Sequence, residues 1–277
     1  MQKFSDDSCL NFCWCFGRSD YTKIMKSFFL VLSVILSNAA FSADPIKVAV
    51  GMYPFAPFVE HKGSSGNVGM TIDLIAALNK IQKQYQFESI LIPPKRRYQS
   101  YKDGHYDVIF YETRTWGWHD IDIEVSRIYQ TGGEVYVALK QPGRGQEYFE
   151  KFDDKEMMGI LGFHYGFADF NANEEYLIKN YRMLLSKDND KNLSMLLKGR
   201  GDVVVVTKAY LHRYFLNYPD AQDQLLISDK LDQEYNHTVL VRPGIKPSVV
   251  EINHMLEILE ESGALRELLK KYGISQD

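Results

Sequence analysis

The sequence predicts an α/β protein made of two similar lobes, because two stretches about ninety-five residues apart share one pattern. The first runs from Lys102 to Phe110, and the second from Lys198 to Val206. In both, a glycine follows a helical pattern and an aspartate precedes an unbroken apolar run. Glycine reaches the left-handed conformation that ends helices, and an unbroken apolar run suits a strand that helices cover on both faces. We therefore expect a mostly parallel sheet in each lobe.

The region around the first repeat alternates strands and helices. Apolar residues at helical spacing predict a helix over 70–84, and a shorter one is expected at 96–101. Strands are expected at 46–50, 87–92 and 134–139. Together with the strand of the first repeat, this order is typical of a parallel sheet whose crossovers are helical.

The region around the second repeat has the same organisation. Strands are expected at 157–161 and 203–206, and helices at 174–181, 189–197 and 209–216. These elements would form a second lobe flanked by helices.

The extended run at 236–241 is predicted to return the chain to the first lobe, where residues 248–272 are helical on both sides of a glycine. This places lobe 1 at 43–139, lobe 2 at 140–234, and the return crossing with the C-terminal helices of lobe 1 at 235–277. Two crossings between lobes allow a hinge that closes about a solute.

Residues 25–42 have the pattern of a secretory signal peptide, with a basic start at Met25, the apolar run Phe28–Leu36, and small residues before Ala43. The apolar run has roughly ten residues, too short to span about 30 Å of hydrocarbon as a permanent anchor, which is the alternative interpretation. Residues 1–24 would be an unusual extension, so we expect translation to begin at Met25. The mature protein is then expected in the periplasm.

All three cysteines, Cys9, Cys13 and Cys15, precede this signal, so the predicted mature chain has none. Their spacing alone would fit a metal site, but neither a further cysteine nor a nearby histidine completes one. A secreted protein without cysteine fits a Gram-negative periplasm better than a eukaryotic extracellular space.

The charge balance argues against nucleic acid as a partner. The formal net charge is −4, and removing the first 42 residues, with four basic and three acidic side chains, leaves about −5. The chain has no basic tract and no long charge block. About 235 mature residues suffice for two lobes of ordinary size, and we expect a monomer without a cofactor or metal.

An ordered series of weak motifs over residues 46–272 resembles the family-3 periplasmic solute-binding proteins, the polar amino-acid receptors of ABC importers. The motifs are Val48–Phe58, Gly69–Leu74, Gly104-x-x-Asp107, Ser126-x-x-Tyr129, Gly162-x-x-x-Gly166 and Gly199-x-x-Asp202. The resemblance implies the type II periplasmic binding fold, with two lobes and two hinge crossings. It also implies a small-molecule ligand and an inner-membrane ABC permease as partner.

Three positions depart from the family's pattern for α-amino acids. The arginine that grips the α-carboxylate with its planar fork is replaced by His119. The aspartate that pairs with the α-ammonium is replaced by Thr207, and the Gly-Thr-Thr helix start reads Gly166-Phe-Ala168. We therefore expect the ligand not to be an ordinary α-amino acid.

Candidate ligand contacts follow the strands, since ligands bind beyond the carboxyl ends of parallel strands. Tyr53 and Phe55 follow the first strand, where the family stacks its ligand on an aromatic ring; packing in the core is the alternative. The stretch after the first repeat holds both signs of charge and two tryptophans, and its alternative role is a surface ion pair with a packed loop. Its candidates are Glu112, Arg114, Trp116, Trp118 and His119.

The other candidates lie around the same expected cleft. Arg97 begins a helix after two prolines, and its charge would suit an anion. His164 and Tyr165 occupy a second-lobe loop that would close over a ligand. Thr207 and Lys208 follow the second repeat strand. For the charged residues among them, a solvent-exposed position is the alternative.

These observations predict a periplasmic protein that captures a small polar or aromatic solute and delivers it to an ABC importer. A ligand-sensing receptor for a signalling partner is the alternative. A dehydratase-like enzyme on the same fold is less favoured, because the sequence has no nucleophile elbow, zinc signature or phosphate loop. We expect no catalytic residues.

Overall fold

The computed structural model describes residues 44–63 and 66–274. The predicted extension at 1–24, the signal peptide at 25–42 and the three cysteines lie outside these residues. Among the helices of the described segments, none is both long and apolar enough to cross a lipid bilayer.

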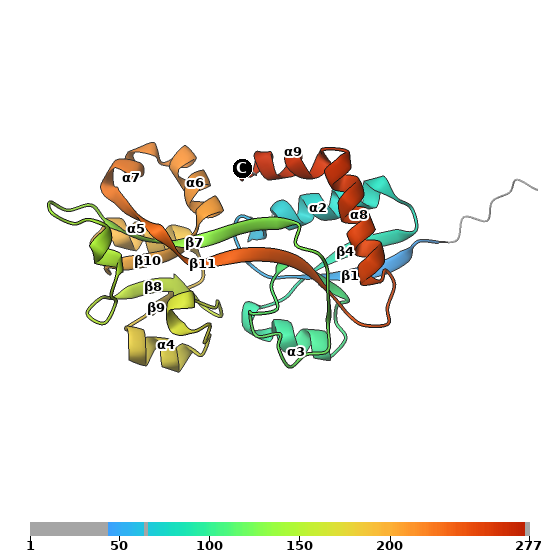
Figure 1. The fold of residues 1–277 in the computed structure, drawn as a ribbon, viewed down its shortest axis with the longest axis horizontal. Coiled ribbons are helices and arrows are strands. Elements are labelled where there is room, and N and C mark those ends of the chain that lie inside the picture. Colours follow the sequence, from blue (N-terminus) through green and yellow to red (C-terminus); the bar gives the residue numbers. More distant parts are fainter. Residues whose placement is uncertain (1–43, 64–65, 275–277) are drawn as a thin grey trace, which may run out of the picture. The chain divides into compact units, whose positions relative to one another are not determined.

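The first half-sheet is parallel and centred on β1 (Ile46–Met52). β4 (Tyr85–Leu91) pairs with β1 along its whole length, and β5 (Val108–Glu112) pairs on its other side. The crossovers are α2 (Met70–Ile81) and α3 (Arg97–Lys102) (Figure 1). This is the predicted alternation of strands and helices, shifted by one to three residues at the ends.

The second half-sheet is also parallel at its outer edge. β8 (Met157–Ile160) pairs with β10 (Val203–Thr207) on one side and with the short β9 (Leu184–Ser186) on the other. The helices α4 (Glu174–Tyr181) and α5 (Asn189–Leu197) coincide with the predicted ranges. Both begin after a residue whose side chain accepts a hydrogen bond from a backbone N–H of the first turn, which stabilises a helix start.

Two long antiparallel strands join the half-sheets. β7 (Gln130–Leu139) and β11 (Leu225–Val241) pair with each other, and β11 continues into the first half-sheet beside β5 (Figure 1). The predicted return crossing at 236–241 therefore begins eleven residues earlier. The pairing shifts register between Ile227 and Gln233, where polar residues interrupt the apolar pattern.

Two helices separate β10 from β11. α6 (Lys208–Asn217) matches the predicted helix, and α7 (Pro219–Gln224) was not predicted. α7 is six residues long with one buried side chain, Ala221, so it lacks a helical apolar stripe that a sequence pattern can reveal.

The C-terminal helices α8 (Val249–Glu261) and α9 (Ala264–Lys271) complete the first half. Ser248 and Glu251 form a capping box at the start of α8, each side chain bonding the other residue's backbone N–H. Gly263 takes φ 75° between the two helices, a conformation that suits glycine. The predicted break at Gly263 is therefore confirmed.

Short elements fill the connections. They are β2 (Glu60–His61), β3 (Asn67–Val68), β6 (Glu124–Val125), and the 3-10 helices η2 (Pro94–Arg96), η3 (Gln146–Phe149) and η4 (Gly166–Ala168).

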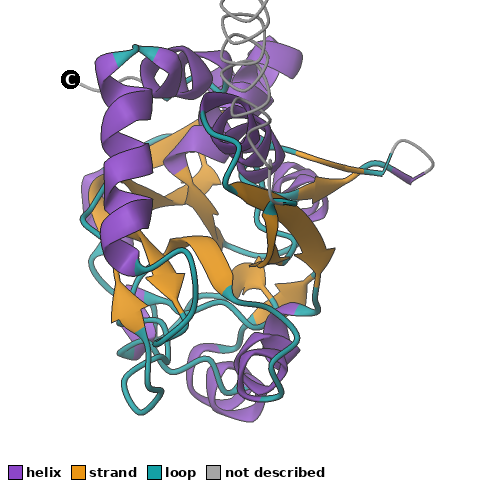
Figure 2. Cartoon of the chain, turned by 90° about the vertical axis from the view of Figure 1, so that its right-hand side faces the viewer, coloured by secondary structure: helices purple, strands orange, loops and turns teal. Residues whose placement is uncertain are grey.

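The valine run of β10 is buried on both faces. Val204 and Val206 belong to one apolar cluster with α5 and α6, whereas Val203 and Val205 belong to another with α4. Helices lie on both sides of the strands (Figure 2). The apolar run of the second repeat is therefore unbroken because helices cover the strand on both faces, as predicted.

The two repeated aspartates have the same structural role. A carboxylate oxygen of Asp107 accepts a hydrogen bond of 3.0 Å from the backbone N–H of Ala49, and Asp202 accepts one of 2.8 Å from Glu156. Each aspartate therefore ties the start of its strand to the neighbouring chain segment. The repeated aspartates thus help to position the strands that follow them.

Candidate functional site

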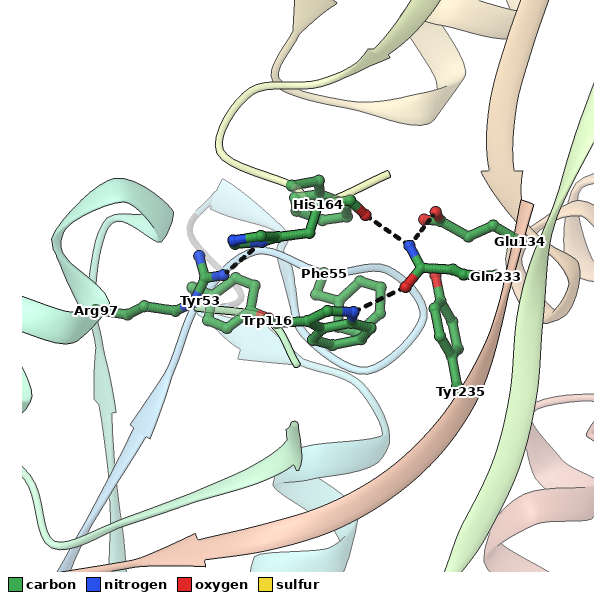
Figure 3. A pocket seen from close by; sticks show the side chains of 9 residues that line it. Tyr53, Phe55, Arg97, Trp116, Glu134, His164, Gln233 and Tyr235 are labelled. Atoms are coloured by element: carbon green, nitrogen blue, oxygen red, sulfur yellow. Dashed lines mark hydrogen bonds between the residues drawn. The ribbon is translucent and has the colours of Figure 1, made fainter. Parts of the chain in front are cut away.

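A small cavity lies where loops from both half-sheets meet the crossing strands β7 and β11 (Figure 3). Its volume of about 10 Å³ leaves room for about one water molecule. The lining comes from the loops after β1, β5 and β8, the start of α3, and the two crossing strands. The residues are Tyr53, Phe55, Arg97, Trp116, Glu134, Phe163, His164, Gln233 and Tyr235.

Aromatic rings make up most of the wall. The Phe55 ring centroid lies 5.8 Å from Trp116, 5.3 Å from Phe163 and 6.0 Å from Tyr235, with the rings at 77–88°. Tyr53 stacks on Phe55 at 6.1 Å. Such edge-to-face and stacked pairs are favourable aromatic geometries, and they enclose an apolar space.

Arg97 and Glu112 form a buried ion pair behind this wall. The Arg97 Nε lies 3.4 Å from a Glu112 carboxylate oxygen, and the two side chains are 2% and 0% exposed. The Trp118 indole N–H donates to the other Glu112 oxygen at 3.1 Å. Burial raises the pKa of Glu112, and the neighbouring Arg97 guanidinium opposes this. The charge of Arg97 is therefore balanced inside the protein.

The guanidinium of Arg97 also connects the two halves of the fold. It donates to the Pro94 carbonyl at 2.9 Å and, across the interface, to the Gly162 carbonyl at 3.2 Å. Its other terminal nitrogen lies 3.2 Å from Nδ1 of His164. Burial, and then Arg97, lower the pKa of His164 to about 3, so the neutral ring accepts this bond. The donors of Arg97 are largely engaged within the chain.

The Gln233 carboxamide lies between Trp116, Glu134 and the loop that carries His164 (Figure 3). Its oxygen accepts a hydrogen bond of 2.8 Å from the Trp116 indole N–H. Its nitrogen donates to Glu134 at 2.9 Å and to the backbone carbonyl of His164 at 2.6 Å. One side chain of β11 thereby bonds a loop of each half and fills the space between them.

Glu134 is a buried carboxyl group, 2% exposed, on β7. Burial, and secondly the charge of Asp232, raise its pKa to about 8, while hydrogen bonds from Tyr235 and Gln233 lower it. None of these three neighbours is cationic. Asp232 in turn accepts bonds from two backbone N–H groups and from the Tyr136 hydroxyl. Unlike Glu112, Glu134 has no basic partner among the groups that shift its pKa.

Five predicted contacts come together at the cavity: Tyr53, Phe55, Arg97, Trp116 and His164. They arrive from four segments far apart in the sequence, as expected for loops at the carboxyl ends of strands in both halves.

Three predicted contacts are buried but do not line the cavity. Glu112 and Trp118 lie behind Arg97, as described above. Tyr165 packs in the apolar core of the second half, and its hydroxyl bonds the backbone of Ile160. Successive residues point to opposite sides of an extended segment, so His164 faces the cavity and Tyr165 faces away from it.

Arg114 and His119 lie on the surface of the loop after β5. Turns in this loop direct Trp116 and Trp118 inward and leave these two side chains in solvent. Thr207 and Lys208 line a separate groove of about 760 Å³ beside the crossing strands. The structure therefore does not bring these four residues to the cavity.

Sequence reasoning missed Glu134 and Gln233. Both belong to the crossing strands, where an isolated polar residue is normally an exposed one. A signal was present, because Glu134 opens the apolar run to Leu139 that predicted β7. Within residues 44–63 and 66–274, no cluster of three or more histidine, cysteine, aspartate or glutamate side chains is suited to hold a metal ion.

Comparison with known proteins defines the class. The model of the bacterial extracellular solute-binding proteins, family 3, matches residues 46–275, so the chain belongs to this family. None of the curated proteins compared with the chain matches it. The predicted family is confirmed.

Solved structures of low sequence identity share the fold. A binding component of an ABC transporter from Wolinella succinogenes, complexed with lysine, is 14% identical with a TM-score of 0.65, over 83% of this chain and 97% of that one. A substrate-binding protein of an ABC uptake transporter from Streptococcus pneumoniae with bound histidine is 20% identical with a TM-score of 0.64, over 82% and 92%. The ancestral amino-acid-binding protein AncCDT-1, a precursor of cyclohexadienyl dehydratase, is 17% identical with a TM-score of 0.59, over 87% and 99%. The predicted fold class, a two-lobed type II periplasmic binding protein, is confirmed.

Proposed function

We propose that this chain captures a small polar or aromatic solute between its two lobes in the periplasm and delivers it to an ABC importer, and that the solute is not an ordinary α-amino acid. The cavity carries this proposal, because loops from both halves close an aromatic space around one buried carboxyl group. We place the lobes at 43–139 and 140–234, with 235–277 returning to the first.

Binding requires the lobes to open. A cavity of about 10 Å³ cannot hold a solute, and Arg97 and Gln233 bond across it in this closed form. Two further ion pairs cross the interface at its sides, Lys95 with Glu174 and Arg213 with Glu60. A solute that bridges the lobes would shift the balance between open and closed forms by its preference for the closed one.

Among the residues that the structure describes, the site offers an α-carboxylate no free anchor. His119 is exposed and Thr207 lies outside the cavity, so these two replaced positions supply no substitute. At the third replaced position the backbone N–H groups of Gly166 and Phe167 already donate to Asp232. Arg97 is bound to Glu112 and to backbone carbonyls. Burial raises the pKa of Glu134 to about 8, so this carboxyl group is no cationic partner for an anion, and ionising it beside a bound anion would be unfavourable in this low-dielectric space.

A thermal-shift screen of the mature chain against amines, organic acids, sugars and α-amino acids tests this proposal. A ligand at one hundred times its dissociation constant adds about 2.7 kcal/mol to the free energy of unfolding. Stabilisation by a compound outside the α-amino acids is expected. Strong stabilisation by a common α-amino acid would contradict the ligand assignment, and no response to any class would contradict solute capture.

Delivery to an importer is tested in cells. Deleting the gene is expected to abolish uptake of the radiolabelled compound that stabilises the protein best. Unchanged uptake, with loss of a transcriptional response to that compound, would favour the alternative of a sensing receptor.

A further inference from the structure

We propose that the solute is a compact organic cation, an amine or guanidine on a flat or apolar body and without an α-carboxylate, whose cationic group replaces the Gln233 carboxamide against Glu134. This inference rests on the proposed function and names the ligand class of the same site.

The charges of the site favour a cation. Arg97 and Glu112 cancel each other as a buried pair, so they leave no net charge for a ligand to balance. Glu134 remains as a carboxyl group that faces the cavity, and within residues 44–63 and 66–274 no basic group is among those that shift its pKa. A buried carboxylate is costly until it is paired. A bound cation would let Glu134 lose its proton and form a buried ion pair, whereas an anion would find no opposite charge at Glu134.

The two acceptors of the Gln233 nitrogen define the hydrogen bonds that the cationic group must donate. The Glu134 carboxyl and the His164 carbonyl both accept from one nitrogen, at 2.9 and 2.6 Å. An ammonium group has three N–H donors and a guanidinium has five, so either can satisfy both acceptors from the same position. These bonds become charge-assisted and therefore stronger than those of the neutral amide.

The aromatic wall suits the body of such a ligand. Phe55, Trp116, Phe163 and Tyr235 surround the same space, and their π-faces attract a cation as well as an apolar group. Trp116 also keeps an indole N–H that bonds the Gln233 oxygen in the closed form. When Gln233 moves away, this donor can meet a hydroxyl or ring nitrogen of the ligand.

Calorimetric titration of the full chain with matched pairs tests the inference. The amines tyramine, histamine, agmatine and cadaverine are each compared with the α-amino acid from which removal of the carboxylate gives them. Tyrosol, in which a hydroxyl replaces the ammonium of tyramine, is the neutral control. At least one amine is expected to bind at least tenfold more tightly than its amino acid. Tyramine is also expected to bind more tightly than tyrosol.

Glu134→Gln keeps the shape of the side chain and removes its charge. It is expected to weaken the best amine by about tenfold to one hundredfold, since bonds to charged groups are the strong ones. Glu150→Gln, at an exposed position outside the cavity lining, is the matched control and should bind like the wild type. Circular dichroism of each variant verifies that it is folded.

The outcomes separate this inference from the proposed function. Tighter binding of the amino acids, equal binding by tyrosol, or an unaffected Glu134→Gln variant would overturn the cation. Binding of a sugar or organic acid, with no amine bound, would also overturn it and leave solute capture intact. If no compound of any class binds, both fail.

Discussion

We expect Glu134→Gln to stabilise the ligand-free protein at alkaline pH and to change its stability little at pH 5. The pKa of Glu134 is raised from 4.5 to about 8 in the folded protein. Between these values the folded state holds a proton that the unfolded state has released, so stability is lost as the pH rises. Below pH 4.5 both states are protonated and the penalty is absent.

The structure sets the size of this effect. Each pH unit between the two pKa values lowers the free energy of unfolding by about 1.4 kcal/mol, so the total loss has an upper bound of about 5 kcal/mol. The titratable groups that face Glu134 are Asp232, Tyr235, Tyr165 and Tyr136. The tyrosines stay protonated over this range, and Asp232 shares the electrostatic cost. We therefore expect a gain of about 2–3 kcal/mol for the variant at pH 8.5.

Thermal unfolding followed by circular dichroism at pH 5 to 8.5 measures the difference. For a domain of this size 1 kcal/mol corresponds to about 2–4 °C, so the variant should gain about 5–10 °C relative to wild type as the pH rises. His164 and His237 are common to both proteins, so their titration cancels. Glu150→Gln should follow the wild type. A Tm difference that is the same at pH 5 and pH 8.5 would mean that Glu134 does not lose a proton at a raised pKa in the folded protein.

Three further predictions concern the lobes and their contacts. Arg97→Met leaves Glu112 buried and unpaired, so urea unfolding should show a free energy of unfolding lower by about 3–5 kcal/mol. The double variant with Glu112→Gln should recover most of this loss, and a double variant as unstable as the single one would exclude the ion pair as the cause. Trp116→Phe should remove the change in tryptophan fluorescence on ligand binding, because Trp116 bonds the side chain that the ligand displaces; an undiminished change would contradict this. Glu60→Gln breaks the partly exposed ion pair with Arg213, so small-angle X-ray scattering of the ligand-free protein should show a larger radius of gyration, and the affinity for the ligand should fall by no more than about fivefold. An unchanged radius of gyration would mean that this pair does not hold the lobes closed.

The order of elements could be predicted because apolar patterns report burial directly. The valine run of β10 is buried on both faces, and the apolar face of α8 packs in the first half. β11 was predicted only in part, because polar residues and register shifts interrupt it between Ile227 and Gln233. Its continuity depends on pairing with β7, which no local pattern encodes.

The site could be predicted where residues follow strand ends. Tyr53, Arg97 and Trp116 were found in this way, since topology alone directs strand ends to the cleft. Glu134 and Gln233 could not be found by this rule, because they lie within the crossing strands. Their burial results from the approach of the two halves, a contact between segments about a hundred residues apart.

We expect a cationic solute to take the place of the Gln233 carboxamide between the lobes, and a crystal structure with the amine that stabilises the protein most is the decisive test. This exchange places the cationic nitrogen within hydrogen-bond distance of Glu134 and the His164 carbonyl, with Gln233 turned away. An amine bound elsewhere, with Gln233 still bonded to Trp116 and Glu134, would contradict it.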